Sequence, residues 1–235
     1  MQHLQIYFRH VPELWHDFPQ LVPGLLVVQG IRADIYAEVP IASWYRQAED
    51  RLRSQSEGQM PEIAAWRRVY AQMGLKPTKY RSAAEALLRR FKREKDLPRL
   101  HPLVDLCNAI SIAYALPVAV FDLAKIDSFL EVRRAVGSET YLSFNGEIEH
   151  PGAGEIIFAD ASGHAHARRW TFRQSQLSVV GKNTGHVLII TEGMHERANK
   201  DVPSLLAGLT RDIASLWAEP EKEVILTADN PRLDM

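Results

Sequence analysis

The sequence has few of the features that covalent cross-linking or membrane insertion requires. Its 235 residues contain one cysteine, Cys107, which excludes an intramolecular disulfide framework and a cysteine-cluster metal site and fits a reducing compartment. No apolar run approaches the roughly 18 residues of a membrane span. The N-terminal residues do not show the basic segment and apolar stretch of a signal peptide. We therefore expect a soluble, cytoplasmic protein with no membrane partner.

Motifs of the common catalytic and cofactor sites are also missing. The chain has no G-x-S-x-G, H-E-x-x-H or P-loop motif, and no G-x-G-x-x-G follows a predicted strand. His164 and His166 would share one strand face and could bind a metal with His186 or His195, although exposed histidines near a turn explain the same pattern. Cys107 lies among apolar residues of an expected helix, which favours a packed side chain over a nucleophile. The sequence thus predicts no metal and no cofactor, and it identifies no catalytic residue.

The overall composition is that of a globular protein, with 46% hydrophobic and 24% charged residues. The net charge of −1 hides an asymmetry, because residues 44–100 contain 14 Lys and Arg against 7 Asp and Glu. The remainder carries 14 basic and 22 acidic residues. Such a concentration of positive charge is what a polyanion-binding face requires. Surface helices on which Arg, Lys and Glu alternate would give the same count.

Helical patterns come first along the chain, and a series of strand patterns follows. Helices are expected at residues 43–56, 61–73, 83–95, 102–116 and 203–218. Strands are expected at residues 4–8, 24–33, 117–122, 128–136, 140–144, 155–160, 166–172, 177–180, 186–191 and 223–227. This order predicts a single α+β domain with a mostly antiparallel sheet and packed helices.

Two of the expected helices carry informative polar residues. Ser82 followed by Glu85 is a capping box, and the helix after it should bury Ala86, Leu87 and Phe91. The helix that opens at residue 102 has an apolar stripe, with short polar side chains near its opposite edge. Polar groups on an otherwise apolar helix need buried partners or a ligand. The stripe contains Leu103, Leu106 and Ile110, and the polar residues are Asp105, Asn108 and Ser111.

Four segments are together similar to a known family: KYRSAAEALLRR, LPRLHPLVDLCNAISIAYALPVAVFDLAKI, EIIFADASGHAHARRWTFRQS and NTGHVLIITEG. They resemble free-standing relatives of the B3/B4 domain, which is the editing module of the bacterial phenylalanyl-tRNA synthetase β subunit. HPLVDLCNAIS and LPVAVFD are the most specific parts of the resemblance. It implies a B3/B4-like editing and tRNA-binding core at residues 61–192, with an N-terminal extension at 1–60 packed on it. Residues 193–235 would add a helix and a strand to the same domain.

The resemblance implies a hydrolytic function. In the synthetase this module removes tyrosine wrongly esterified to the phenylalanine tRNA, since a pocket for phenylalanine cannot strongly reject one added hydroxyl. Attack on an activated ester needs only a positioned water and donors for the developing oxyanion. The implied function is therefore a trans-acting editing hydrolase that binds tRNA or aminoacyl-tRNA, and not DNA. The alternative is a non-catalytic module that binds tRNA or an amino acid. Nothing in the chain resembles an ATP-dependent aminoacylation core.

The resemblance assigns several residues to the amino-acid pocket. Asn108 matches an asparagine that lines the pocket, and Pro117 and Asp122 match the segment that closes it. Cys107 occupies the position of a pocket threonine. Ala119 occupies the position of a pocket histidine, and the loss of that histidine favours the binding module.

Gln174 is interpreted as the replacement for the glutamate that accepts the tyrosine hydroxyl in the family. Arg169 is expected to face a ligand, and because successive strand residues point to opposite sides, only one of Arg168 and Arg169 can share the pocket face. Structural ion pairing is the alternative for both. Basic residues before and within the helix at 83–95 are expected to contact tRNA phosphates, with Tyr80 stacked on a base, unless they form a solvated helix face. The tRNA-binding set is Lys79, Tyr80, Arg81, Arg89, Arg90 and Arg93.

Overall fold

Six α-helices and twelve β-strands are present among residues 6–235, which are the residues that the computed structural model describes. The helices are α1 (Pro12–Asp17), α2 (Glu38–Ser54), α3 (Pro61–Gln72), α4 (Ala83–Glu94), α5 (Pro102–Tyr114) and α6 (Ala198–Leu216). The strands are β1 (Tyr7–His10), β2 (Val22–Gln29), β3 (Val118–Asp122), β4 (Phe129–Arg134), β5 (Tyr141–Leu142), β6 (Ile148–Glu149), β7 (Ile156–Ala159), β8 (Ala165–Arg168), β9 (Arg173–Gln174), β10 (His186–Gly193), β11 (Lys222–Ile225) and β12 (Arg232–Asp234).

The strands form two main sheets, and most of the pairs are antiparallel. One sheet has the order β12-β1-β4-β7-β8-β9, in which only β1 and β4 run parallel. The other has the order β11-β2-β10-β3 and is antiparallel throughout. β5 and β6 form a small separate ribbon. The predicted α+β class with a mostly antiparallel sheet is confirmed.

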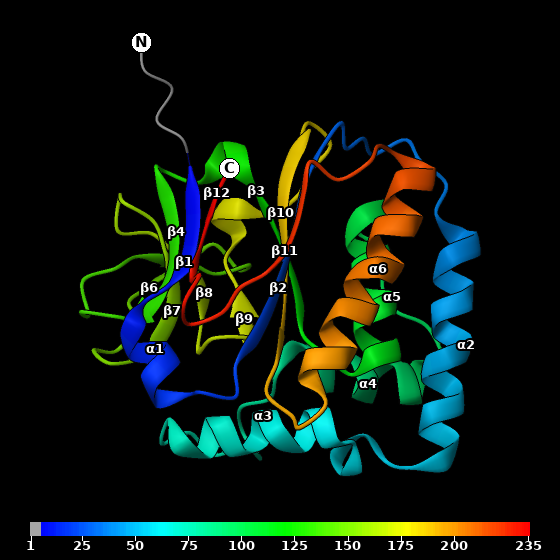
Figure 1. Ribbon diagram of the computed structural model, residues 1–235, viewed down its shortest axis with the longest axis horizontal. Coiled ribbons are helices and arrows are strands. Elements are labelled where there is room, and N and C mark those ends of the chain that lie inside the picture. The colour runs from blue at the N-terminus through cyan, green and yellow to red at the C-terminus, as the bar shows by residue number, and fades with distance from the viewer. Residues whose placement is uncertain (1–5) are drawn as a thin grey trace.

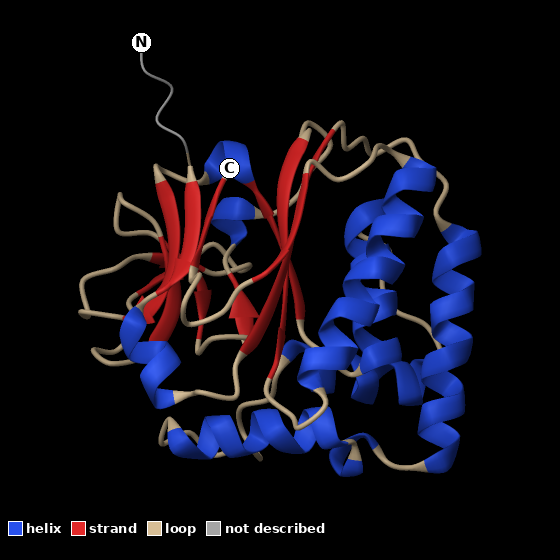
Figure 2. Cartoon of the chain, in the orientation of Figure 1, coloured by secondary structure: helices blue, strands red, loops and turns tan. Residues whose placement is uncertain are grey.

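The four-stranded sheet is the middle of three layers (Figures 1 and 2). Six consecutive residues of its inner strand β2 are buried, as a sheet covered on both sides requires. One face packs on the six-stranded sheet through Phe121, Phe158 and Leu188. The other face packs on α2, α5 and α6 through residues such as Leu26 and Ile110.

α6 lies unusually close to the middle sheet because two strand residues have no side chain. A Cβ added to Gly193 would lie 2.6 Å from the Cβ of Ala198, and one added to Gly24 would lie 2.7 Å from Cγ1 of Val202. Gly24 and Gly193 are on the adjacent strands β2 and β10. Because these two glycines lack Cβ atoms, α6 can pack directly against the backbone of β2 and β10.

Several local predictions are wrong, each for a tertiary reason. α4 buries Ala84, Leu88 and Phe91, whereas Ala86 is exposed and Leu87 is half-buried, because α5 and α2 meet the helix on a different face. Residues 177–180 are not a strand: Gln176–Ser178 is a 3-10 helix capped by the Ser175 hydroxyl.

Other boundaries differ from those expected. The strand at 166–172 ends at Arg168, and Pro203 lies inside α6 rather than at its start. The prediction for residues 4–8 lies partly outside the described residues, and the strand there is Tyr7–His10. The sequence pattern predicts none of α1, β6, β9 and β12. The domain boundaries at 60 and 192 stay predictions, although strands from residues 7–29 and 222–234 take part in both main sheets.

No helix in the described range, 6–235, combines the length and the apolar character needed to cross a membrane.

Candidate functional site

A half-enclosed cavity of about 380 Å³ lies between α5, β3 and the segment that follows β9. Its wall is mainly aliphatic, and its polar side chains are two amides and one thiol. Two exposed apolar side chains, Leu100 and Phe144, also line it. We call it the amide cavity, and it is lined by Leu100, Val104, Cys107, Asn108, Val118, Val120, Phe144, Gln174, Val179 and Val180.

The polar groups of the amide cavity are positioned by the fold in different ways. Gln174 donates from Nε2 to the Val120 carbonyl at 2.7 Å, and among residues 6–235 no donor bonds to its Oε1, which can accept from a ligand. Asn108 is half-buried on α5. Cys107 is fully buried, and burial raises the pKa of its thiol far above the ordinary value, with the nearby Asp105 carboxylate adding to the effect. The thiol is therefore a packing group and not a nucleophile.

A second cavity of about 70 Å³ adjoins the first. Val118 and Gln174 line both cavities, while Pro117 and Ala119 line only the smaller one. The aromatic side chains Phe158, Trp170 and Phe172 also line the smaller cavity. Five of the residues expected in the amino-acid pocket thus border the two adjoining cavities: Cys107, Asn108, Pro117, Ala119 and Gln174.

Glu192 is a polar group of this smaller cavity that the sequence did not reveal. Its side chain is 3% exposed, and Oε1 meets His10 Nε2 at 2.6 Å and accepts from Trp170 Nε1 at 2.8 Å. Trp66 donates to its backbone carbonyl at 3.2 Å. These donors hold a buried carboxylate at the wall of the smaller cavity, which Thr171, Arg173 and Gln174 also line. Glu192 follows an apolar strand pattern directly, so nothing in the local sequence marks it.

Two of the expected pocket residues lie away from both cavities. Asp122 accepts from the Thr184 hydroxyl at 2.7 Å and from the Ala124 amide at 3.1 Å, so it holds the turn after β3. Arg169 has a positive φ of 49°, and its guanidinium lies over the rings of Tyr80 and Phe172. The expected alternation fails at Arg169 because β8 has already ended.

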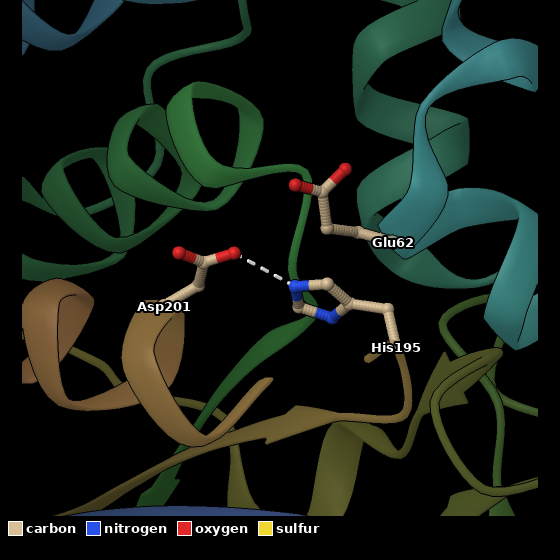
Figure 3. A group of neighbouring side chains, drawn as sticks. All are labelled: Glu62, His195 and Asp201. Atoms are coloured by element: carbon tan, nitrogen blue, oxygen red, sulfur yellow. Dashed lines mark hydrogen bonds and ion pairs between the residues drawn. The ribbon is translucent and has the colours of Figure 1, made fainter. Parts of the chain in front are cut away.

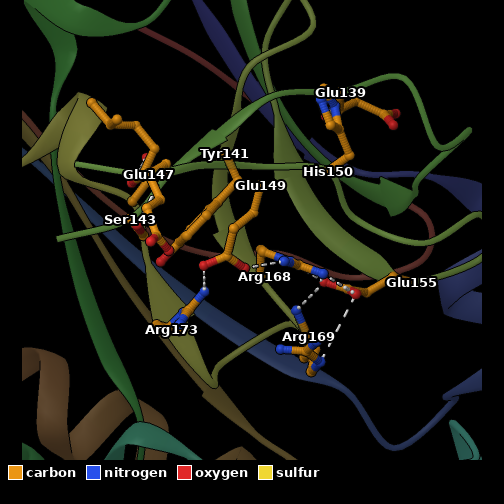
Figure 4. A network of polar contacts seen from close by, with 12 residues as sticks. Glu139, Tyr141, Ser143, Glu147, Glu149, His150, Glu155, Arg168, Arg169 and Arg173 are labelled. Carbon is orange, nitrogen blue, oxygen red and sulfur yellow. Dashed lines mark hydrogen bonds and ion pairs between the residues drawn. The ribbon is translucent and has the colours of Figure 1, made fainter. Parts of the chain in front are cut away.

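Arg168 is the centre of a buried ion network (Figure 4). Its Nε and one terminal nitrogen donate to the two oxygens of Glu155 at 2.8 and 2.9 Å, and the other terminal nitrogen donates to Glu149 at 2.5 Å. Arg173 reaches the second oxygen of Glu149. Burial opposes ionisation of Glu149, but the hydrogen bond and charge of Arg173, with the charge of Arg168, leave its pKa below the ordinary value. Structural ion pairing accounts for Arg168.

The basic residues expected to bind tRNA are largely paired with carboxylates. Arg89 donates to Glu85 at 3.0 Å, and Arg90 and Arg93 both donate to Glu94. Hydrogen bonds from Arg93 and then Arg90 lower the pKa of Glu94. The remaining members are Arg81, which lies 3.5 Å from Glu85, Lys79, which lies over the Tyr80 ring, and Tyr80, which packs edge-on against Phe172.

The expected capping box forms only in part. The Ser82 hydroxyl accepts from the Glu85 amide, but the Glu85 carboxylate does not return to Ser82. It is bound instead by Arg67 at 2.7 and 3.0 Å, which fixes α4 against α3.

A family model described as B3/4 domain matches residues 65–202, more than half of the chain. Among solved structures, an N-terminal fragment of the phenylalanyl-tRNA synthetase β subunit from Pyrococcus horikoshii is similar, with 12% identity and a TM-score of 0.41. The match covers 86% of this chain and 48% of that one, so the chain spans about half the length of the fragment. A search of curated proteins finds no match.

Proposed function

The chain belongs to the B3/4 domain family, and from this premise we propose that it binds the charged end of a tRNA in the amide cavity and hydrolyses a mischarged aminoacyl ester. It would act in trans, in the cytoplasm, and contribute to translation fidelity. The observation that carries the proposal is the convergence of Asn108 and Gln174, from distant parts of the chain, on one apolar cavity.

The amide cavity has the size and lining of a small-ligand site. Its volume of about 380 Å³ falls within the range of roughly 300–1,000 Å³ found for such sites. The aliphatic wall suits an apolar amino-acid side chain, and the free Oε1 of Gln174 suits an ammonium or hydroxyl donor. Asn108 offers both a donor and an acceptor at the same wall.

Hydrolysis at this site would depend on position rather than on a nucleophilic side chain. A water oxygen would bond to the ester carbonyl carbon, the bond from that carbon to the ribose oxygen would break, and a water proton would end on the ribose. The amide N–H of Asn108 would donate to the oxyanion that forms in between. A positioned donor of this kind can contribute a factor of roughly 10²–10³ in rate.

The charged face of α4 would support the tRNA. Its arginines are held by Glu85 and Glu94, so phosphate contact would exchange one set of anionic partners for another. The exposed Phe144 at the cavity wall provides a ring on which a terminal base could stack.

A non-catalytic binding module is the second candidate. The observation that favours it is the lining of the amide cavity, which contains no carboxylate, histidine or lysine to act as a general base. Under this reading the same two amides would recognise an amino acid or a tRNA end without cleaving it.

Deacylation of mischarged tRNAs separates the two candidates. The panel includes tyrosine on the phenylalanine tRNA and near-cognate pairs with aliphatic side chains, and the wild type is compared with Asn108→Ala. The control is Asn183→Ala, an exposed asparagine outside the cavity. Hydrolysis that only Asn108→Ala abolishes supports the editing enzyme. Binding of tRNA without hydrolysis of any pair supports the binding module, and absence of both refutes the proposal.

Salt dependence tests the tRNA contact independently. If α4 follows the phosphates, affinity for tRNA falls steeply with salt concentration, and an Arg89/Arg90/Arg93→Ala variant has a shallower slope. If the tRNA affinity of the wild type hardly changes with salt concentration, α4 does not contact the tRNA phosphates.

A further inference from the structure

A cavity of about 460 Å³ lies apart from the amide cavity, and the two share no lining residue. It contains three potential metal ligands, Glu62, His195 and Asp201, whose ligand atoms all lie within 4.8 Å of one another. They come from the first turn of α3, the segment after β10 and the first turn of α6. Figure 3 shows the three side chains together. We propose that Glu62, His195 and Asp201 bind a first-row divalent cation of the zinc or manganese class.

The chemistry of the three groups favours that class of ion. One imidazole and two carboxylates form a mixed nitrogen and oxygen set, which suits zinc or manganese, whereas magnesium and calcium prefer oxygen ligands. Three protein ligands leave a coordination position for water or a substrate. The adjoining cavity gives that position room.

The carboxylates are oriented by arginines on their outer sides. Arg51 donates to Oε2 of Glu62 at 2.8 Å and to the Ala113 carbonyl at 3.0 Å. Arg197 lies 3.5 Å from Oδ1 of Asp201. Each carboxylate therefore keeps one oxygen free of arginine, and partners of this kind typically orient metal ligands.

His195 is buried, and its two ring nitrogens differ in their hydrogen bonding. Its side chain is 3% exposed, and Nε2 donates to Oδ2 of Asp201 at 2.8 Å. Nδ1 is buried and has no hydrogen-bond partner in the described range. For Nε2 to bind a cation, its proton must move to Nδ1 or leave the ring, and the hydrogen bond to Asp201 is exchanged for the bonds of both groups to the ion.

The nearby charges leave an excess of negative charge for the ion. Besides the two carboxylate ligands, Glu196 lines the cavity, and the cationic groups there are Arg51 and Arg197. With a neutral imidazole the sum is one negative charge, which a divalent cation would reverse in sign. The charges around the three ligands thus favour a divalent cation at this site.

The test is direct titration of the chelator-treated protein with Zn²⁺, Mn²⁺ and Mg²⁺, followed by calorimetry and by thermal unfolding. The expected result is one Zn²⁺ per chain, with tighter binding than Mg²⁺ and a Tm higher by several degrees. His195→Gln and Glu62→Gln should each weaken Zn²⁺ binding by roughly 100-fold or more. Glu62→Gln keeps an acceptor for Arg51 and therefore tests the ligand without removing that contact.

The matched control is His186→Gln. His186 pairs with Glu221 at 3.2 Å on the surface, where both side chains are about 40% exposed, and this pair has no third ligand. Its loss should leave Zn²⁺ affinity unchanged. Co²⁺ absorption bands of the wild type give a readout that needs no variant. Failure of the wild type to bind Zn²⁺, or equal affinities for wild type and His195→Gln, would overturn the proposal.

Discussion

Arg168 and Arg173 allow a comparison between a buried guanidinium that binds two carboxylates, Glu149 and Glu155, and a more exposed one that binds Glu149. Both guanidiniums donate to Glu149 at 2.5 Å, and both lie near the Tyr141 ring, at 5.7 and 5.0 Å from its centroid. The side chain of Arg168 is 7% exposed and that of Arg173 is 38% exposed. Replacement of each by methionine retains much of the aliphatic stem and removes the charge.

The two substitutions should lower the free energy of unfolding by amounts that differ severalfold. Arg168→Met leaves Glu155, whose side chain is 13% exposed, with the Arg169 backbone amide at 3.2 Å and the Arg169 guanidinium at 3.8 Å. Removing one partner of a buried pair costs about 3–5 kcal/mol, whereas a solvent-exposed pair contributes about 0–1 kcal/mol. For a chain of this length, about 2–4 °C per kcal/mol gives a Tm lower by roughly 6–20 °C for Arg168→Met and by at most a few degrees for Arg173→Met.

Urea unfolding followed by tryptophan fluorescence measures both losses, since the fully buried Trp170 reports on this part of the fold. An equal loss in the two variants would show that burial does not decide the energy of these contacts. A loss below about 1 kcal/mol for Arg168→Met would place the network in the class of weak surface pairs.

Three further predictions concern other parts of the fold. Burial and the Asp105 charge raise the pKa of Cys107, so a thiol reagent at pH 8 should label only the unfolded protein. Rapid labelling of the native protein would contradict the burial of the thiol. Gly193→Ala should lower the free energy of unfolding by about 1–3 kcal/mol, because its Cβ would lie 2.6 Å from that of Ala198; an unchanged urea midpoint would show that α6 moves freely. For Asp160, burial acts to raise the pKa, but the hydrogen bonds from His166 and the His164 amide outweigh it and hold the pKa below the ordinary 3.8. The stability that this carboxylate contributes is therefore complete above about pH 4 and is lost as the pH falls through the lower pKa of the folded state. Asp160→Asn should thus reduce the fall in the free energy of unfolding that urea unfolding measures between pH 6 and 3. Identical pH profiles of the free energy of unfolding in the two proteins would exclude the contribution.

The sequence predicts the helices and the α+β class because those signals are local. Pro61 and Pro102 open α3 and α5 as expected, and Gly74, with φ of 74°, follows the end of α3. The face that a helix buries is less predictable, since it depends on neighbours from distant parts of the chain. In α4 the buried residue is Leu88 rather than Leu87 for this reason.

The candidate site is predictable where a family motif marks it and unpredictable elsewhere. Cys107, Asn108 and Gln174, which the resemblance assigns to the pocket, line one cavity, and their role in binding stays a prediction. The partners of Glu192, and the members of the cluster around His195, come from parts of the chain that are far apart in the sequence, and no motif at a fixed spacing links them. Single-sequence patterns carry no information on such contacts.

The interleaving of the two chain ends in the sheets has a consequence for synthesis on the ribosome. Tyr7 pairs with Asp234 in one sheet, and Leu26 lies between Ile189 and Glu223 in the other. β1 can pair with β4 once residues 129–134 have been made, whereas β2 keeps both edges unpaired until β10 and β11 have been made. Pairings of such long sequence separation fold slowly and expose the nascent chain to aggregation. Folding of this chain in the cell should accordingly depend on chaperones that shield β2 during translation.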